Sequence, residues 1–481
     1  MTVRGAEVPG LGMDVGFVCH GWYPDPGGVE SHTRDLAREL ATRGHRVHVL
    51  CLSYDPAREP YSVQDEEVEG VRIRRMAYLY HDHGALADVV RNRKAEDVVM
   101  AWLAETPCDL IHVHHVTGFG LGALRAISDV GQPFVMTAHD YWSLCPRGQM
   151  LHVDGSVSSE PEPERCADCL RSTWPHLMPS ATGRPEGPEG EPLDGDADAT
   201  RARTAWALEM LALPHRLFTP SGPARAVYER AGVPADRIVV CENGVDVTGL
   251  RERVGALRSE RADDGKVHLG VLGSVMPSKG ALELARAFVA ADAPELVLEI
   301  HGNLPPYHGD ASYVEELQAL AAEHDAIHLH GEYSLDELPG ILASLDGVAA
   351  PSRWAEVYGL TVREARAAGL PVLVSDAGDL AAVAAGGRAG RVLPKEDPAA
   401  WQRALEEFAR DADQRAAWAA AETPLRSARD MMLQLERAYV EVIREVTNEE
   451  PSLVHPLEGQ APELPPAPAK KPGLLRRLFG R

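Results

Sequence analysis

Residues 346–380 read DGVAAPSRWAEVYGLTVREARAAGLPVLVSDAGDL, and this stretch decides the fold of the chain. An apolar run typical of a buried strand ends at Pro351. A loop and a segment of helical periodicity follow, and Gly369 and Pro371 mark the end of that helix. Apolar residues after Pro371 predict the next strand. The stretch therefore predicts a strand–helix–strand unit, which is the repeating element of doubly wound α/β sheets.

Two carboxylates lie in this unit, Glu356 in the loop and Glu364 on the helix predicted over 359–368. The first turn of a helix offers unpaired N–H groups and a partial positive charge, which suit an anion. Gly359, at the junction, lets a ligand approach the backbone. The pattern predicts a sugar-nucleotide site with phosphates on the N–H groups and hydroxyls on the carboxylates. An ordinary unit with two surface glutamates fits the spacing equally well.

The composition indicates a globular protein of two domains or more. The chain has 481 residues, 44% of them hydrophobic, and a formal net charge of −24. This charge argues against nucleic acid as a partner. No apolar run has the length of a membrane span, the first residues lack a signal-peptide core, and seven cysteines form no disulfide framework. We expect a cytoplasmic protein.

The N-terminal half shows the same α/β order as the opening stretch. Strands are predicted over 14–20 and 45–52, with a glycine loop and a helix over 29–42 between them. The pair Gly27-Gly28 is either a tight turn or a loop that admits a phosphate, and it lacks the G-x-G-x-x-G pattern of dinucleotide-binding proteins. His139 is the last residue of the strand predicted over 133–139, at the carboxyl end where such sheets place ligand groups.

The C-terminal half repeats this order from residue 267 onward. A strand over 267–273 leads into the loop GSVMPSKG, which ends at Lys279-Gly280 before the helix predicted over 281–290. A lysine beside a helix N-terminus can neutralise a leaving diphosphate. Further strands are predicted over 296–302 and 327–330, with helices between them.

These motifs together resemble the retaining glycosyltransferases of family 4, a GT-B family. The resemblance rests on GGVE at 27–30, TAHDYW at 137–142, Lys279-Gly280, and the E-x7-E segment from Glu356 to Glu364 with its Ala-x-Gly-x-Pro sequel. It covers residues 14–446. It implies two Rossmann-like doubly wound domains facing a cleft, with a C-terminal helix that crosses back to the first domain.

The resemblance also implies the site residues. Glu356, Lys279 and His139 are the expected catalytic residues. The expected donor-binding residues are Gly27, Gly28, Gly273, Lys279, Glu356, Val357, Tyr358, Gly359 and Glu364. The donor is a nucleotide-diphosphate sugar, and we expect no metal ion and no other cofactor. Ser274 stands where the family usually has arginine, so either Lys279 suffices for the diphosphate or another cation such as Arg353 assists.

The resemblance and the composition divide the chain into five parts. We expect a flexible leader over 1–12, an acceptor-binding domain over 13–215 with a mobile acidic loop at 179–203, and a nucleotide-sugar domain over 216–410. A returning helix is expected over 411–446. A proline-rich linker and a basic amphipathic tail occupy 447–481. The tail from Lys470 to Arg481 fits a peripheral membrane contact, a contact with a partner protein, or a solvated basic segment equally well.

Two questions stay open at the level of sequence. Cys145, Cys166 and Cys169 lie in one short loop-like region with His152, and they are either free thiols or ligands of a structural zinc ion. The acceptor is a saccharide, a lipid-linked saccharide or a small molecule. Two other functions use the same scaffold: a nucleotide-sugar epimerase or hydrolase, and a catalytically silent nucleotide-sugar-binding protein.

Overall fold

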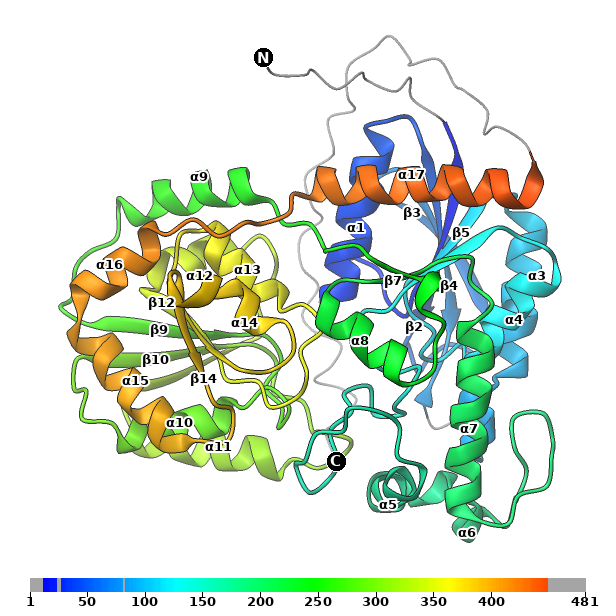
Figure 1. Cartoon of the computed structure of the whole chain (residues 1–481), viewed down its shortest axis with the longest axis horizontal. Coiled ribbons are helices and arrows are strands. Elements are labelled where there is room, and N and C mark those ends of the chain that lie inside the picture. Colours follow the sequence, from blue (N-terminus) through cyan, green and yellow to red (C-terminus); the bar gives the residue numbers. More distant parts are fainter. Residues whose placement is uncertain (1–11, 24–26, 81–82, 449–481) are drawn as a thin grey trace.

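The computed structural model describes residues 12–23, 27–80 and 83–448, which form two α/β units that lie side by side (Figure 1). The predicted leader up to residue 11, and the predicted linker and basic tail from residue 449 on, lie outside the described residues. Each unit is built around one sheet with helices on both faces.

The sheet of the first unit has the strand order β3-β4-β2-β1-β5-β6-β7-β8, and its strands are parallel except that β3 is antiparallel to β4. Its strands are β1 (Asp14–Val18), β2 (Arg46–Ser53), β3 (Val63–Val68), β4 (Val71–Ala77), β5 (Leu110–Val113), β6 (Phe134–Thr137), β7 (Leu217–Thr219) and β8 (Ile238–Val240). Its helices are α1 (Gly28–Ala41), α2 (Leu86–Val90), α3 (Arg93–Glu105), α4 (Gly122–Asp129), α5 (Pro163–Thr173), α6 (Pro179–Thr182), α7 (Asp196–Leu211) and α8 (Gly222–Arg230).

The sheet of the second unit is parallel throughout its described strands, in the order β11-β10-β9-β12-β13-β14. Its strands are β9 (Val267–Leu272), β10 (Leu296–His301), β11 (Ile327–Gly331), β12 (Gly347–Ala350), β13 (Val372–Ser375) and β14 (Gly390–Leu393). The helices after β8 are α9 (Val247–Arg258), α10 (Ala281–Ala290), α11 (Ser312–Glu323), α12 (Leu338–Ser344), α13 (Leu360–Ala367), α14 (Leu380–Val383), α15 (Pro398–Arg410), α16 (Ala412–Ala420) and α17 (Ala428–Thr447).

Both sheets are apolar on their two faces because helices cover each face. On β6, Phe134 and Met136 pack into the core on one face and Val135 into the core on the other. On β13, Val372 and Val374 pack toward one layer of helices, while Leu373 packs toward the other. The predicted doubly wound α/β architecture is confirmed.

The last helix returns to the first unit, as the resemblance implies. α17 packs beside α1 and buries Met431, Leu435 and Tyr439 in the core on that face of the sheet (Figure 1). The Tyr439 hydroxyl lies 2.6 Å from Nδ1 of His112 on β5. The 2.7 Å contact of Glu436 with Arg43 adds a partly buried ion pair. The apolar face of α17 therefore completes a core that the first unit alone would leave open.

The first sheet extends beyond residue 215, where the first domain was predicted to end. β7 pairs with β6 through Leu217 and Met136, and β8 pairs with β7. Leu217, Phe218 and Ile238 are buried in the cores of the first unit. The boundary after residue 215 is therefore wrong, because these apolar strands have their hydrogen-bonding partners and their burial in the first sheet.

Two segments expected to be loops are partly helical. The segment 179–203, expected as a mobile loop, contains α6 and the first turns of α7. Asp196 anchors it, because its carboxylate accepts hydrogen bonds from the Ser180 amide at 2.9 Å and hydroxyl at 2.7 Å. Cys166 and Cys169 lie on α5 and not in a loop, since Pro163 occupies the first turn of that helix.

Long helices predicted at two places are each divided. The region 85–104 contains α2 and α3, and Asn92 caps α3 through a hydrogen bond from the Ala95 amide at 3.3 Å. The region 411–446 contains α16 and α17, and Pro424 lies in the extended stretch between them. Side chains that compete for backbone groups, and proline, end helices at these points.

Candidate active site

A cleft of about 470 Å³ lies between the two units, at the carboxyl ends of several strands. Its lining includes every residue that the sequence predicted for the site, namely Gly27, Gly28, His139, Gly273, Lys279, Glu356, Val357, Tyr358, Gly359 and Glu364. Parallel sheets collect loop residues at this edge because each strand points its carboxyl end the same way. The structure thus brings together groups from four separate loops.

Lys279 lies in the loop between β9 and α10. Gly280, which follows it, adopts a left-handed backbone with φ +74°, and a Cβ there would lie 2.1 Å from the carbonyl oxygen of Pro351. Only glycine fits so close to another backbone. The loops after β9 and β12 are held together here, since the Arg353 amide donates to the Ser278 carbonyl at 2.8 Å. Close backbone packing therefore positions the lysine.

The Glu356 carboxylate is the centre of the polar contacts on this wall. Its Oε1 lies 2.5 Å from Nζ of Lys279 and accepts a hydrogen bond from the Ser352 hydroxyl at 2.7 Å. Glu356 is 5% exposed, and the Lys279 side chain is 34% exposed toward the cleft. The Lys279 amine also lies 5.3 Å from the centre of the Trp354 ring. The pair combines a buried anion with a cation that a ligand can reach.

Gly359 precedes α13, which begins one residue later than predicted. It has φ +71°, and a Cβ would meet Cδ2 of Leu380 at 2.5 Å, so glycine is required for the turn. The residues before it join the two units: the Ser221 hydroxyl donates to the Val357 carbonyl at 2.6 Å, and the Tyr358 hydroxyl donates to the Asn243 carbonyl at 2.6 Å. The free N–H groups of α13 therefore face the cleft from a fixed position.

Glu364, one turn into α13, faces α1 of the first unit. Burial, with a smaller contribution from the Asp35 charge, raises the pKa of Glu364 to about 7. Burial also raises the pKa of Asp35 to about 6, against the lowering effect of Arg38 and Arg34. A carboxyl group with such a pKa is partly protonated near neutral pH, and it can both donate and accept hydrogen bonds.

His139 belongs to a group of histidines on the first unit's wall. Its Nε2 lies 3.2 Å from Nδ1 of His114, and its ring centre lies 4.6 Å from that of His32. Burial, and then the neighbouring imidazoles, hold the pKa of His139 well below its usual value. The ring is therefore neutral near pH 7. Asp140, its neighbour, instead contacts Nε2 of His115 at 3.3 Å.

The glycine pair lies at the start of α1. A Cβ on Gly27 would lie 2.0 Å from Oε2 of Glu30, whereas a Cβ on Gly28 would meet no atom within 4 Å. Glu30 also lies 3.2 Å from Nε2 of His20. The Glu30 carboxylate therefore lies against Gly27, a contact that the sequence did not reveal. Gly28 leaves open space beside the cleft.

The cleft has a second cation that sequence reasoning missed. Among the described residues that line it, the cationic side chains are Lys279 and Arg34, and Arg34 on α1 is paired with Glu69 at 2.6 Å. Arg353, expected as a substitute for the arginine missing at Ser274, does not line the cleft. Its guanidinium lies 3.2 Å from Glu283 instead. The loop motifs could not indicate Arg34, because its position beside the cleft depends on how the two units pack against each other.

The geometry of the cysteine region favours free thiols over zinc. Cys145, Cys166, Cys169 and His152 line one small pocket, and Nδ1 of His152 lies 3.2 Å from Sγ of Cys169. They are not among the groups of described residues whose ligand atoms all lie within 4.8 Å of one another. Burial raises the pKa of the Cys166 thiol to about 11.

The arrangement suits a nucleophilic displacement at a phosphate-activated carbon. Lys279 and the N-terminus of α13 can stabilise an anion that develops on a leaving group, because both lie at the same wall of the cleft. Glu356, Glu364 and His139 offer hydrogen-bonding groups for hydroxyls around it.

Two family models match consecutive parts of the chain. The model for Glycosyltransferase Family 4 matches residues 26–248, and the model for Glycosyl transferases group 1 matches residues 256–423. The gap between the two matches falls within α9, where the chain has left the first sheet after β8 and has not yet entered the second at β9.

Curated relatives align over most of the chain. A phosphatidyl-myo-inositol mannosyltransferase from Mycolicibacterium smegmatis is 25% identical over 410 residues, which cover 85% of this chain and 88% of that protein. A D-inositol 3-phosphate glycosyltransferase from Stackebrandtia nassauensis is 25% identical over 411 residues, covering 82% of each.

Solved structures share the fold at lower identity. Sucrose-phosphate synthase from Thermosynechococcus elongatus has a TM-score of 0.67 at 17% identity, over 90% of this chain and 100% of that one. Anabaena HepE in complex with UDP-glucose has a TM-score of 0.56 at 16% identity, over 91% of this chain and 98% of that one.

WaaG, a glycosyltransferase involved in lipopolysaccharide biosynthesis, has a TM-score of 0.58 at 17% identity, over 89% of this chain and 99% of that one.

No helix among the described residues combines the length and apolarity that crossing a membrane requires. Motifs, architecture and both family models agree: the chain belongs to the GT-B glycosyltransferases of family 4.

Proposed function

We propose that the protein transfers a sugar from a nucleotide-diphosphate sugar to a hydroxyl acceptor with retention of configuration. The observation that supports this most directly is the contact of 2.5 Å between Lys279 and Glu356 in a cleft that also contains the N-terminus of α13. A buried anion that holds a partly exposed cation prepares the site for a charged ligand. The diphosphate competes for Lys279 and frees Glu356 for the sugar.

In the proposed reaction, the bond between the anomeric carbon and the diphosphate oxygen breaks, and its electron pair leaves with the diphosphate. Lys279 and the N–H groups at the start of α13 stabilise the negative charge that develops there. The acceptor oxygen forms its new bond on the face that the diphosphate leaves. Its proton passes to a phosphate oxygen of the leaving group, so that atoms and charge balance.

The remaining site residues orient the donor. Glu364 binds the ribose hydroxyls, and Glu356 binds hydroxyls of the sugar. His139 contacts the sugar from the first unit, and its neutral ring makes this a hydrogen bond and not an ion pair. Gly28 and Gly273 leave room beside the phosphates, because a Cβ at either would meet no atom within 4 Å, whereas the Glu30 carboxylate covers Gly27. Val357 and Tyr358 position the loop before α13.

The acceptor belongs to a class suggested by the relatives' names. Those names specify phosphatidyl-myo-inositol and D-inositol 3-phosphate, one a lipid and one a small polar molecule. Both present secondary hydroxyls on a ring next to a phosphate. We propose a polyol or saccharide hydroxyl, free or lipid-linked, as the acceptor, and these two compounds are the first to test.

The experiment begins with donor binding to the full chain. Thermal shifts are measured with UDP-, GDP- and ADP-sugars and with each nucleoside diphosphate, for the wild type and for Glu364→Ala. We expect one nucleotide to raise the melting temperature of the wild type and to lose most of that effect in the variant. An exposed glutamate outside the cleft lining, Glu316 on α11, gives the control Glu316→Ala.

Transfer is then assayed with the selected donor and both inositol acceptors. The anomeric configuration of the product is compared with that of the donor by NMR coupling constants. An inverted product contradicts retention while leaving glycosyl transfer intact. Donor hydrolysis without transfer to any hydroxyl acceptor contradicts the proposed acceptor class.

A further inference from the structure

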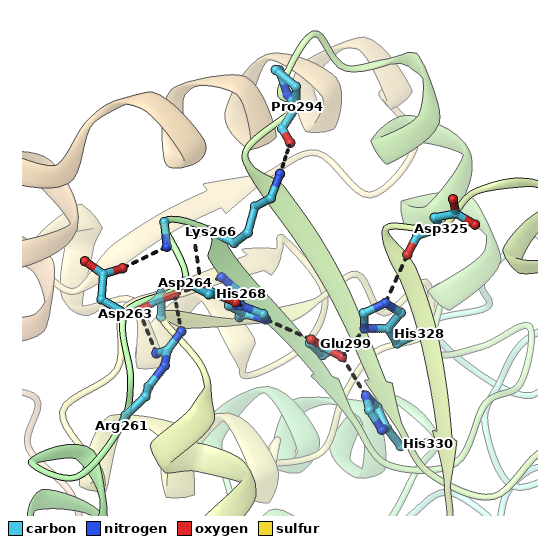
Figure 2. A network of polar contacts seen from close by, with 12 residues as sticks. Arg261, Asp263, Asp264, Lys266, His268, Pro294, Glu299, Asp325, His328 and His330 are labelled. Carbon is cyan, nitrogen blue, oxygen red and sulfur yellow. Dashed lines mark hydrogen bonds and ion pairs between the residues drawn. The ribbon is translucent and has the colours of Figure 1, made fainter.

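Three histidines surround one carboxylate at the edge of the second sheet, away from the residues that line the cleft. Glu299 lies on β10, His268 on the neighbouring strand β9, and His328 and His330 on the edge strand β11. The parallel register places Glu299 opposite His328. Figure 2 shows the imidazoles directed toward Glu299 from both sides. Alternation along β11 puts His328 and His330 on the same face.

Glu299 lies within hydrogen-bonding distance of all three histidines. Oε2 of Glu299 lies 3.0 Å from Nδ1 of His328 and 2.5 Å from Nε2 of His330. Its other oxygen, Oε1, lies 2.8 Å from Nδ1 of His268. The ligand atoms of Glu299, His328 and His330 all lie within 4.8 Å of one another. One carboxylate oxygen therefore faces two ring nitrogens that come from the next strand.

The hydrogen bond that His328 makes on the side away from Glu299 determines which of its ring nitrogens carries the hydrogen. Nε2 of His328 lies 3.0 Å from the backbone carbonyl oxygen of Asp325, which can only accept, so Nε2 carries the hydrogen (Figure 2). A neutral imidazole has one N–H, so Nδ1 then presents a lone pair to the lone pairs of Glu299. Two changes remove this repulsion: a second proton on the ring, or a cation between nitrogen and oxygen.

The surrounding bonds match those that support metal ligands. Histidines that bind metals commonly donate their other ring nitrogen to a carbonyl or a carboxylate, which orients the ring. His328 does so toward the Asp325 carbonyl, and Nε2 of His268 lies 3.1 Å from the Asp264 carboxylate. Because His268 holds Oε1, the other oxygen of Glu299 stays directed at β11.

The carboxylate side of the site is buried, and the side with the two imidazoles of β11 is open to solvent. The Glu299 side chain is 10% exposed, whereas those of His328 and His330 are 46% and 43% exposed. An ion can therefore enter from solvent between the two imidazoles and reach the carboxylate below. Two imidazole nitrogens and a carboxylate oxygen are ligands that Zn²⁺ prefers among the abundant divalent ions, and such three-ligand sites leave a fourth position to water.

We propose that Glu299, His328 and His330 bind a divalent transition-metal ion, with Zn²⁺ as the best fit, and that His268 is a positioning residue. The ion would tie the edge strand β11 to β10. β11 ends at Gly331, and the next residues, 332–335, line the cleft. The site is built from residues outside that lining, and the proposal does not depend on the reaction proposed above.

The test measures Zn²⁺ binding to the full chain after removal of metals by a chelator. Isothermal titration compares the wild type with His328→Ala/His330→Ala and with a control, His176→Ala/His324→Ala, which removes two histidines outside the group. We expect the wild type and the control to bind one more equivalent of Zn²⁺ than the test variant. Glu299→Gln should weaken binding at this site by more than about 100-fold.

Cobalt spectroscopy of the wild type distinguishes this site from the cysteines. Co²⁺ bound by nitrogen and oxygen gives visible bands without the intense near-ultraviolet absorption of a cobalt–thiolate bond. We expect the visible bands in the wild type and in the cysteine variant Cys166→Ser, and their loss in His328→Ala/His330→Ala. Circular dichroism of the metal-free variants checks that each is folded.

Two results would overturn the proposal. One is equal Zn²⁺ stoichiometry and affinity in the wild type and in His328→Ala/His330→Ala. The other is a cobalt spectrum of the wild type with thiolate absorption alone. If the double variant fails to fold, His328→Ala and His330→Ala are titrated singly, and Zn²⁺ binding equal to that of the wild type in both overturns the proposal.

Discussion

The two walls of the cleft use opposite chemistry. The wall from the second unit contains a charged pair, Lys279 and Glu356, and the ionisable Glu364 with its pKa near 7. On the wall from the first unit, His139 and His114 are in contact, and burial keeps the pKa of each well below its usual value. Burial without a counter-charge keeps imidazoles neutral, whereas on the other wall an amine and a carboxylate lie in direct contact. The wall with Lys279 and Glu356, the charged wall, therefore suits a diphosphate. The histidine cluster on the first unit, the neutral wall, suits sugar hydroxyls, and Arg34 and Glu30 line the cleft beside it.

Of the changes proposed here, replacing Lys279 on the charged wall should have the largest effect on transfer. We expect Lys279→Met to lower kcat/KM for transfer by about 10²–10³, because the leaving diphosphate loses its counter-charge. Initial rates at low donor concentration give this value. Lys266→Met is the matched control, since the exposed Lys266 amine donates a hydrogen bond to the Pro294 carbonyl at 3.0 Å on the surface.

Glu356 loses its partner in the same variant, so stability must be separated from chemistry. The double variant Lys279→Met/Glu356→Gln should recover the melting temperature but not the activity. Transfer rates within twofold of the wild type in Lys279→Met would refute the assignment of the diphosphate to the charged wall.

The backbone under the charged wall should be the next most sensitive feature. We expect Gly280→Ala to lower the free energy of unfolding by about 2–3 kcal/mol, because its Cβ would collide with the Pro351 carbonyl in a left-handed conformation. Chemical denaturation measures this change. Gly255→Ala, inside α9 with no atom within 4 Å of the added Cβ, should instead stabilise by about 0.5–1 kcal/mol. A Gly280→Ala variant as stable as the wild type would contradict the collision.

The neutral wall should respond more weakly. We expect His139→Ala to lower kcat/KM for transfer about 10-fold, the cost of one neutral hydrogen bond to the sugar. The affinity for the nucleoside diphosphate alone should stay within twofold, because that ligand part lies on the other wall. His176→Ala, at an exposed position, is the control. A parallel loss of diphosphate affinity would show that the two walls do not divide the donor as proposed.

The smallest expected effect is a pH dependence that comes from Glu364. Its pKa is raised to about 7 in the folded protein, so the folded state binds more protons than the unfolded state at intermediate pH. Stability from this group is present at low pH and is lost as the pH rises from about 5 to 8.

Denaturation of the wild type and of Glu364→Gln across that range measures the effect. We expect the free energy of unfolding to fall ~1 kcal/mol more per pH unit in the wild type than in the variant. Asp35→Asn should move the wild-type transition to lower pH, because it removes the nearby negative charge. Identical pH profiles for the wild type and Glu364→Gln would refute the raised pKa of the Glu364 carboxyl group.

Local patterns predicted much of this fold because glycine, proline and apolar runs act over a few residues. Gly359, Gly369 and Pro371 delimit α13 to within one residue of its observed ends. Strand β3 escaped prediction because it reads VQDEEV, an acidic edge strand with almost no apolar pattern. Its pairing depends on Arg74 and Arg75 of β4, which contact Asp65 at 2.7 Å and Glu66 at 2.5 Å.

The sequence by itself determined which residues lie in loops at the carboxyl ends of strands, and hence that Lys279, Glu356 and His139 could reach one cleft. Only the tertiary structure decided their partners. Lys279 and Glu356 meet across 77 positions, Asp35 faces Glu364 from another unit, and Glu299 gathers histidines from two strands. Strand register and the packing of two units set these distances, and both depend on many weak contacts distributed along the whole chain.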